Sequence, residues 1–484
     1  MTRRIRSIKL RLAFTIASLC LGMLAVIGAE RPNILFCLAD DMSWLHTSID
    51  GDPAIQTPNF DKLAKAGVRF QHAYCSAPSC TPSRAATLTG QAFCRLEEGA
   101  SLLSTLPGKF SVYPDILEKA GYAVGYAGKG WDPGDWRPAG RTRNPAGPEY
   151  ASFRAFVEKL ETGKPFCFWL GSHDPHRPYK PNSGIKAGID PSKIIVPPIV
   201  PDSPEVRADI ADYLYAIQRF DRDVGKAVSE LQSRGLLTNT LIAISSDNGM
   251  PYPRGKCNLY DWGTRMPLAF SWAGHIPTNR LVTDMVSLTD LAPTFLEAAG
   301  LQIPREMTGR SLLPLLLSGK AGRIDKNRDE VFFGRERHDT FRREGELKLG
   351  YPMRAIRTDD YLYIRNFKPD RIPSGDSPVK NQDNDRGPAK AFVVRQKDDQ
   401  SVRPFYQRAY GLRPAEELYD LAKDPKQWNN VAPDKAYETT LAKMRLRLDT
   451  VMTTLEDPRR PNGPNPDVFD TYPTYSRPRT NNPE

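Results

Sequence analysis

Four short apolar runs, each followed at once by polar residues, constrain the fold of this chain more than any other feature. The runs cover residues 33–39, 122–127, 165–171 and 241–245. Continuous apolar runs of this length are typical of strands buried on both faces. Helical patterns lie between and after them, at 61–66, 114–120, 208–233 and 288–299. This alternation predicts an α/β fold: a doubly wound, mostly parallel sheet flanked by helices.

The residues that follow these runs are the first candidates for a functional site. In a doubly wound sheet, ligands bind just beyond the carboxyl ends of the strands. Polar groups that are far apart in the sequence can therefore meet at that edge. The groups in question are Asp40 and Asp41, Lys129, His173 and His176, and Asp247 and Asn248.

The first 29 residues have the pattern of a secretory signal peptide. They contain five basic and no acidic residues, then an apolar run and small residues. The alternative is an uncleaved membrane anchor, although the run is short for a full span. We expect export to the periplasm or medium, with no stable membrane insertion after cleavage.

The remaining length exceeds one ordinary core, which favours a large domain followed by a smaller one. We place the large domain at 30–345 and a smaller α+β subdomain at 346–456. The subdomain has β-like runs at 353–357 and 361–366 and a helix at 434–452. The tail at 457–484 is rich in Pro and Asn and is expected to be irregular.

Charge and cysteine content narrow the classes of partner. Removing the five basic leader residues lowers the formal net charge from +10 to +5, a mild excess that favours anionic substrates. The basic residues are scattered and no nucleic-acid motif accompanies them, so we expect no nucleic-acid partner. The seven cysteines include one in the leader. We expect mostly buried thiols rather than a full disulfide framework.

One motif carries chemistry by itself: Cys-Thr-Pro-Ser-Arg-Ala-Ala-Thr-Leu-Thr-Gly, from Cys80 to Gly90. Pro82 and the alanines predict a helix that starts here, which puts Cys80 at the positive end of the helix dipole. Arg84, one turn on, can face the same anion. The alternative is a chance match around a structural cysteine. Four fixed residues should occur by accident on the order of a few times in a thousand such chains.

The motif resembles the signature of the sulfatase family, in which its first residue is oxidised to formylglycine by a formylglycine-generating enzyme or an equivalent. The resemblance implies an alkaline-phosphatase-like fold and a hydrate of formylglycine at position 80 as nucleophile. A hydrate has two hydroxyls, so one can attack sulfur and the other can then expel sulfate. Serine could manage only the first step by itself.

A cation site is expected at the strand ends. Asp40, Asp41, Asp247 and Asn248 offer hard oxygen ligands suited to Ca²⁺, or less well to Mg²⁺, while zinc is disfavoured. Taken singly, each pair could instead be a helix cap or a turn. In the family these four positions bind a divalent cation that also holds the formylglycine hydroxyl. The resemblance therefore implies one Ca²⁺ per chain, with residue 80 as a further ligand.

Two lysines and two histidines complete the expected site. Lys129 and Lys256 could be ordinary surface lysines, but each lies in a stretch similar to the family, which implies contact with sulfate oxygens. His173 and His176 could bond to backbone in a turn. We favour His176 as the acid for the leaving group, with His173 as a further substrate contact.

The resemblance covers nearly all of the mature chain and is strongest to the heparan N-sulfatase, or sulfamidase, branch. It includes the stretches ending at Arg177, Asp209, Pro253, Thr294 and Arg354. Two departures stand out: Trp131 where that branch has His, and Lys256 where it has Arg. The implied substrate is a sulfated glycan sugar from glycosaminoglycan breakdown, with N-sulfoglucosamine favoured and a sugar O-sulfate second.

Two other functions are compatible with the sequence. A phosphomonoester or phosphonate hydrolase could share this fold, although the intact Cys-x-Pro-Ser-Arg motif argues against it. A non-catalytic polysaccharide-binding protein would keep Cys80 as a free thiol.

Overall fold

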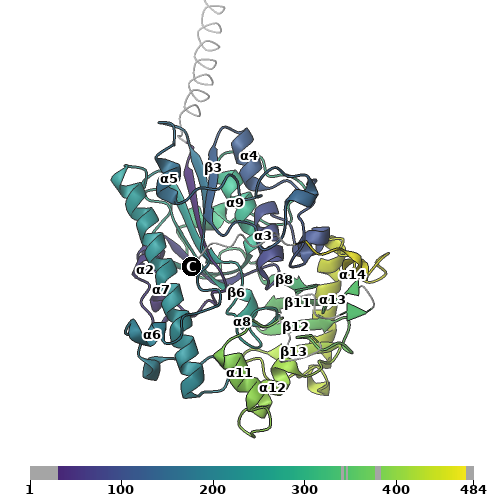
Figure 1. Cartoon of the computed structure of the whole chain (residues 1–484). Coiled ribbons are helices and arrows are strands. Elements are labelled where there is room, and N and C mark those ends of the chain that lie inside the picture. The colour runs from purple at the N-terminus through teal and green to yellow at the C-terminus, as the bar shows by residue number, and fades with distance from the viewer. Residues whose placement is uncertain (1–30, 339–342, 345–346, 376–382, 476–484) are drawn as a thin grey trace, which may run out of the picture.

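A computed structural model describes residues 31–338, 343–344, 347–375 and 383–475. The expected leader at 1–29 and the last residues of the tail lie outside the described residues. Figure 1 shows a large sheet flanked by helices, with a smaller sheet beside it. Within the described ranges no helix is both long and apolar enough to cross a membrane.

The large sheet has seven strands in the order β3-β4-β1-β5-β6-β2-β7. Strands β3, β4, β1 and β5 are parallel neighbours, and β6 runs against the other strands. This confirms the expected α/β class with a mostly parallel sheet. The bounds are β1 Asn33–Ala39, β2 Val68–Tyr74, β3 Ala123–Gly128, β4 Phe166–Gly171, β5 Thr240–Ser246, β6 Arg265–Ser271 and β7 Arg280–Ser287.

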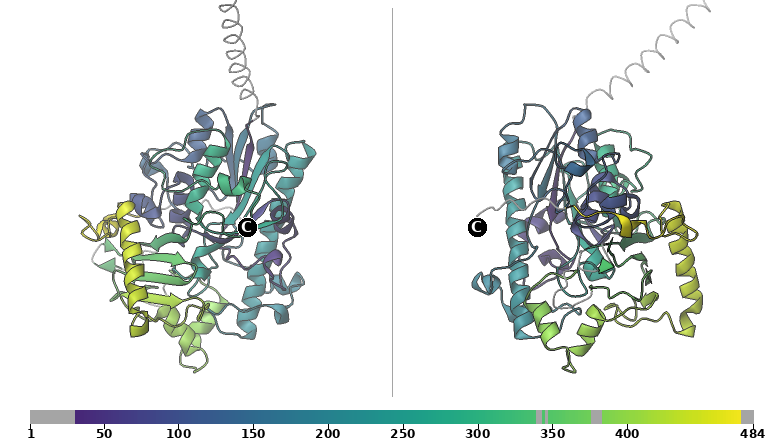
Figure 2. Two further views of the ribbon diagram at one scale, coloured as in Figure 1. Left: turned by 180° about the vertical axis from the view of Figure 1, so that it is seen from behind. Right: turned by 45° about the vertical axis from the view of Figure 1, so that its right-hand side comes forward.

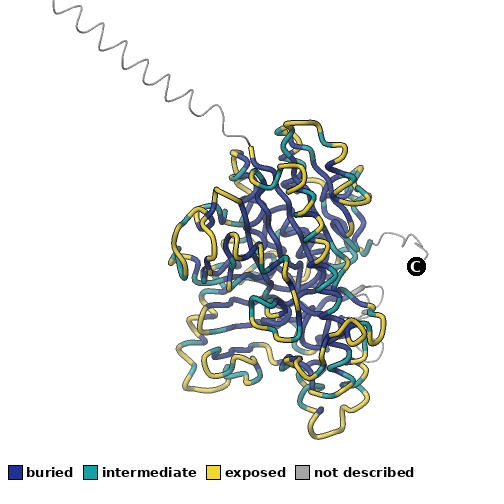
Figure 3. The backbone as a smooth tube through the Cα atoms, turned by 90° about the vertical axis from the view of Figure 1, so that its left-hand side faces the viewer, coloured by how far each residue is buried: buried dark blue, intermediate teal, exposed yellow. Residues whose placement is uncertain are grey.

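Both faces of this sheet are covered, and β1 shows why. Its alternate side chains enter two different cores. Ile34, Phe36 and Leu38 pack with α3 (Cys80–Thr89), α4 (Tyr113–Lys119) and α9 (Leu291–Ala298). Leu35, Cys37 and Ala39 pack with α2 (Pro58–Lys65), α5 (Phe153–Val157) and α7 (Pro204–Ser233). Figure 3 shows that the buried parts of the backbone lie in the interior and that the exposed parts lie at the periphery. The helix bounds are α2 Pro58–Lys65, α3 Cys80–Thr89, α4 Tyr113–Lys119, α5 Phe153–Val157, α6 Ser183–Lys186, α7 Pro204–Ser233, α8 Asp261–Thr264, α9 Leu291–Ala298 and α10 Leu313–Leu317.

The smaller sheet is antiparallel, in the order β13-β12-β11-β8. One face packs on α13, which lies across the molecule from α7 in Figure 2. The sheet begins with β8, before residue 346, where the sequence placed the start of this part. The bounds are β8 Glu330–Arg335, β9 Arg343–Glu344, β10 Leu347–Lys348, β11 Met353–Thr358, β12 Tyr361–Asn366, β13 Glu416–Asp420, α11 Pro388–Arg395, α12 Arg403–Tyr410, α13 Glu438–Thr454 and α14 Val468–Thr471.

The tail after residue 456 is more ordered than expected. It forms α14, and the carboxylate of Asp457 is fully buried. Asp457 accepts hydrogen bonds from Arg354 Nε at 2.5 Å and Nη2 at 3.0 Å. Arg459 binds Glu336 in the same way, at 2.9 Å for both bonds. These paired charges hold the tail against the smaller sheet, which the Pro-rich composition did not predict.

Candidate active site

Cys80 is the first residue of α3 and is 2% exposed. The helix starts here because Ser79 has extended backbone and Pro82 lies in the first turn, where a missing N–H costs nothing. The hydroxyl of Ser79 does not cap the helix. It is hydrogen-bonded to His338 Nδ1 at 2.8 Å instead. Cys80 therefore lies at a buried helix start, where the dipole favours an anion.

The ends of β1 and β5 bring the four expected cation ligands together. These strands are parallel neighbours with Ala39 opposite Ser246, so the residues that follow them meet. The N–H of Asp41 donates to Asp247 Oδ1 at 3.1 Å, and Asn248 Nδ2 donates to Asp41 Oδ1 at 2.5 Å. Sγ of Cys80 lies 3.5 Å from Asp40 Oδ1. The predicted convergence at this edge of the sheet is present.

The donor set fits Ca²⁺. One ligand atom each of Asp40, Asp41 and Cys80 lies within 4.8 Å of the others. The side-chain oxygen of Asn248 is buried and has no hydrogen-bond partner among the described residues. Buried carboxylates and an orphaned amide oxygen are costly unless a cation compensates them, and all of these oxygens are hard ligands.

Each of the three buried carboxylates accepts a hydrogen bond from one lysine or arginine side chain. Arg84 Nε donates to Asp247 Oδ2 at 2.7 Å. Lys129 Nζ donates to Asp40 Oδ2 at 2.7 Å, and Lys256 Nζ donates to Asp41 Oδ2 at 2.8 Å. The three expected cations therefore surround the cluster.

Arg84 is held more tightly than the lysines. Its Nη1 donates to the carbonyls of Lys129 and Gly130 at 2.9 Å each, and the side chain is 0% exposed. Its Nη2 has no hydrogen-bond partner among the described residues and lies 3.8 Å from Asp40 Oδ1. One donor of Arg84 is therefore free to meet an anion beside Cys80.

The two adjacent aspartates have opposite pKa shifts. Burial would raise the pKa of Asp40, but the charges of Lys129, His176 and Arg84 outweigh it and hold that pKa well below its usual range. For Asp41, burial outweighs the attraction of Lys256 and raises the pKa to about 6. The pair therefore carries less than its full charge below that pH.

Burial also raises the pKa of the Cys80 thiol well above its ordinary value, although Lys129 and Lys256 oppose the shift. The thiol remains protonated at neutral pH. Since the thiolate is the nucleophilic form, an unmodified Cys80 is a poor nucleophile in this setting.

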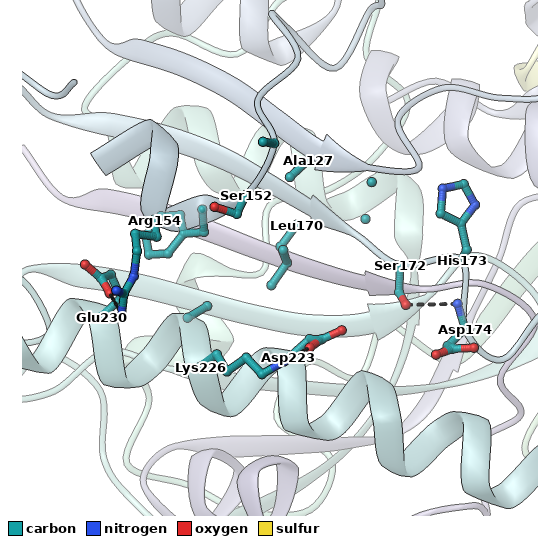
Figure 4. A pocket seen from close by; sticks show the side chains of 15 residues that line it. Ala127, Ser152, Arg154, Leu170, Ser172, His173, Asp174, Asp223, Lys226 and Glu230 are labelled. Carbon is teal, nitrogen blue, oxygen red and sulfur yellow. Dashed lines mark hydrogen bonds and ion pairs between the residues drawn. The ribbon is translucent and has the colours of Figure 1, made fainter. Parts of the chain in front are cut away.

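The structure brings His176, rather than His173, next to the carboxylates. Nδ1 of His176 donates to the carbonyl of Arg177 at 2.5 Å, and Nε2 lies 3.8 Å from Asp41 Oδ2. His173 is exposed and lines a cavity of about 670 Å³ between α7 and the ends of β3 and β4. Figure 4 shows this cavity, with Ser172 bonded to the N–H of Asp174.

Trp131 is buried next to the first turn of α3, the helix that contains the motif. Its side chain is 0% exposed, and Nε1 donates to the carbonyl of Thr81 at 3.2 Å. A histidine at this position could exchange protons, whereas an indole N–H can only donate. Trp131 therefore has a structural contact beside the nucleophile position.

Sequence reasoning missed one charged residue of the site, Asp385. Its Oδ2 lies 3.3 Å from Lys256 Nζ, and it forms a second possible cluster with Asp41 and His176. Asp385 follows no strand, so the strand-end argument could not find it. Only the acidic stretch Asp383-Asn384-Asp385 gave a signal.

Fold and site together define a class: a hydrolase with an alkaline-phosphatase-like fold and a nucleophile position beside clustered carboxylates and cations. The Sulfatase family model matches residues 32–143 and 148–301. The chain therefore belongs to the sulfatase family and is a hydrolase. A second model, described as N-sulphoglucosamine sulphohydrolase, C-terminal, matches residues 255–371.

Three known proteins show the range of similarity. Human N-sulphoglucosamine sulphohydrolase is 29% identical over 491 aligned residues, covering 91% of this chain and 94% of that protein. A structure solved with its substrate D-glucosamine-2-N,6-O-disulfate has a TM-score of 0.65 at 20% identity, covering 88% and 99% of the two chains. The phosphonate monoester hydrolase of Agrobacterium radiobacter has a TM-score of 0.66 at 18% identity, covering 88% and 96%. At this level of identity, the two solved structures show only that the fold is shared.

Proposed function

We propose that this sulfatase removes the N-linked sulfate of N-sulfoglucosamine in a glycan. The observation that carries the proposal is the position of Cys80, at the start of α3 and 3.5 Å from Asp40 Oδ1 in a cluster ringed by lysines. The similarity to human N-sulphoglucosamine sulphohydrolase along 91% of the chain supports the choice of substrate.

Formylglycine at position 80, present as its hydrate, supplies the nucleophile. One hydroxyl attacks sulfur and the sugar nitrogen leaves. The other hydroxyl then loses its proton, sulfate departs and the aldehyde is restored. A maturation enzyme must supply the oxidation of Cys80, because a buried, protonated thiol cannot do this chemistry.

The surrounding residues divide the remaining work. Arg84, Lys129 and Lys256 bind sulfate oxygens and stabilise the charge that develops on them. His176 protonates the leaving sugar atom, and exposed His173 contacts the substrate further out. Ca²⁺, when bound by Asp40, Asp41, Asp247, Asn248 and residue 80, supplies positive charge next to the sulfate.

A sugar O-sulfate is the second candidate substrate. Two residues favour an O-sulfate. Lys256 is the residue usual in O-sulfatases at this position, and Trp131 replaces a histidine of the sulfamidase branch. A phosphonate hydrolase on the same fold is a weaker alternative because the Cys-x-Pro-Ser-Arg motif is intact.

A release assay on N-, 2-O- and 6-O-sulfated glucosamine, with a phosphonate monoester beside them, tests the substrate. We expect the N-sulfated sugar to have the highest kcat/KM. Preference for an O-sulfate would replace our first choice with the second. Preference for the phosphonate would contradict the assignment of the reacting group altogether.

Mass spectrometry of the peptide that contains residue 80 tests the nucleophile. Conversion to formylglycine lowers its mass by about 18 daltons. An unconverted thiol in active protein would refute the mechanism. We further propose that residues 1–29 are removed on export to the periplasm or medium, which predicts a mature N-terminus at residue 30.

A further inference from the structure

We propose that Asp385 selects the substrate by the charge next to the reacting sulfate. Its carboxylate accepts a hydrogen bond from a neutral donor of the sugar and repels a second sulfate group at that place. This inference rests on the proposed function in one respect, that the substrate is a sulfated sugar. It holds whichever sulfate is removed.

Asp385 differs from the other carboxylates of the site in its exposure. The side chains of Asp40, Asp41 and Asp247 are 2%, 0% and 0% exposed, whereas that of Asp385 is 21% exposed. The first three are sealed inside the cluster. Asp385 is the one carboxylate of these four that is partly exposed to solvent.

The carboxylate of Asp385 also has free acceptor capacity. Its Oδ2 is buried, forms an ion pair with Lys256 and has no hydrogen-bond partner among the described residues, so a sugar donor would have to reach the other oxygen, Oδ1. An ionised carboxylate has about four lone-pair positions and no donor. It can therefore accept from a hydroxyl or an amine, and it cannot pair with a sulfate or another carboxylate.

A negative charge at this place is unexpected in a site that binds an anion. Lys256 pairs with Asp41 at 2.8 Å as well as with Asp385 at 3.3 Å, so the ammonium group lies between two carboxylates. A fourth carboxylate beside three cations weakens the attraction for every anion that approaches. The site gains selectivity, because a sugar with one sulfate suffers less from this repulsion than a sugar with two neighbouring sulfates.

The protein fixes the position of Asp385 through the residue after His176. Arg177 donates to both oxygens of Asp209 on α7, at 2.8 and 2.6 Å. Asp209 Oδ2 also accepts from the N–H of Ala389 at 3.1 Å. At Gly387 an added Cβ would lie 2.3 Å from Arg177 Nη1, so the backbone there packs directly on the guanidinium. The segment with Asp385 is thereby tied to the loop with His176.

The test compares two substrates that differ by one charge. The first carries a single sulfate at whichever position the wild-type enzyme hydrolyses, and the second carries an additional sulfate on the same sugar. Asp385→Asn keeps the shape of the side chain and removes its charge. We expect kcat/KM for the doubly sulfated sugar, relative to the singly sulfated one, to rise about tenfold, mainly through KM.

Two further variants control the comparison. Asp398→Asn removes an exposed carboxylate just beyond α11 and should leave the ratio unchanged. Asp385→Glu retains the charge and should keep the ratio low. Thermal unfolding of each variant shows whether it is folded. Should Asp385→Asn unfold, Asp385→Ser takes its place in the same comparison.

The outcomes separate this inference from the proposed function. An unchanged ratio in folded Asp385→Asn, or an equal loss on both substrates, would overturn it, since a residue that only positions Lys256 would affect both sugars alike. Hydrolysis of an O-sulfate but not of an N-sulfate would contradict the favoured substrate. The role of Asp385 could then still be tested with two sugars that both carry this O-sulfate, one of them with an additional sulfate.

Discussion

The two walls of the site are built in different ways. The inner wall consists of the ends of β1 and β5 and the start of α3, and strand register sets the positions of its carboxylates. The outer wall comes from the C-terminal part, where Asp385 and His338 sit on irregular segments held by packing. On our proposals, the inner wall serves the bond-breaking step, whereas the outer wall selects the sugar.

The largest expected effect is on the inner wall. Cys80→Ala should abolish sulfate release, with a loss of about a millionfold, because it removes the nucleophile. Its thermal unfolding should stay close to that of the wild type. Cys80→Ser should release at most one product per enzyme in a burst, since serine lacks the second hydroxyl. Steady turnover by either variant would contradict the mechanism.

The two histidines should differ sharply, although they lie three residues apart. His176→Ala should lower kcat by about a hundredfold to ten-thousandfold, and least for a substrate with a good leaving group. His173→Ala, at an exposed position, should mainly raise KM. The dependence of kcat on the leaving group, measured for both variants, shows which histidine is the general acid. A larger dependence in His173→Ala would reverse our assignment.

Calcium removal should lower activity by about a hundredfold or more, with recovery on adding Ca²⁺ and less on adding Zn²⁺.

Because burial raises the pKa of Asp41 to about 6, a proton competes for that carboxylate below this pH. Calcium affinity, measured by titration calorimetry, should therefore fall as the pH drops from 7 to 5. Asn248→Ala should weaken binding too, and unaltered affinity in that variant would argue against this ligand set.

The smallest expected effect lies in the outer wall. Gly387→Ala should push the backbone away from Arg177, destabilise the fold by about 1–3 kcal/mol and reduce discrimination between singly and doubly sulfated sugars. Gly319→Ala is the matched control, because nothing lies within 4 Å of its added Cβ. Equal behaviour of the two variants would mean that the outer wall is not held at Gly387.

The same contrast explains how much the sequence could predict. β1 and β5 are recognisable because they are buried on both faces, and in a parallel sheet the residues after them must meet. β6 was missed because it contains Pro267, which argues against a strand within a sheet. The choice between His173 and His176 depended on which imidazole turns inward, and a spacing of three residues in a loop cannot fix that.

Asp385 was beyond sequence reasoning for a related reason. It enters the site because Arg177, Asp209 and Gly387 pack together, and these residues are up to 210 positions apart. No periodicity records such a contact. For the same reason, the sequence did not show that β8, which lies before residue 346, pairs with β11 in the smaller sheet.

The 2% exposure of Cys80 sets an order of events during biosynthesis. A modifying enzyme cannot reach a side chain enclosed by its own helix, the strand ends and the lysines around it. On our proposal, oxidation must take place while the segment is still extended, before the sheet closes over it. A molecule that folds before modification would stay inactive for its lifetime. The active fraction of any preparation would therefore depend on the rate of Cys80 oxidation relative to the rate of folding.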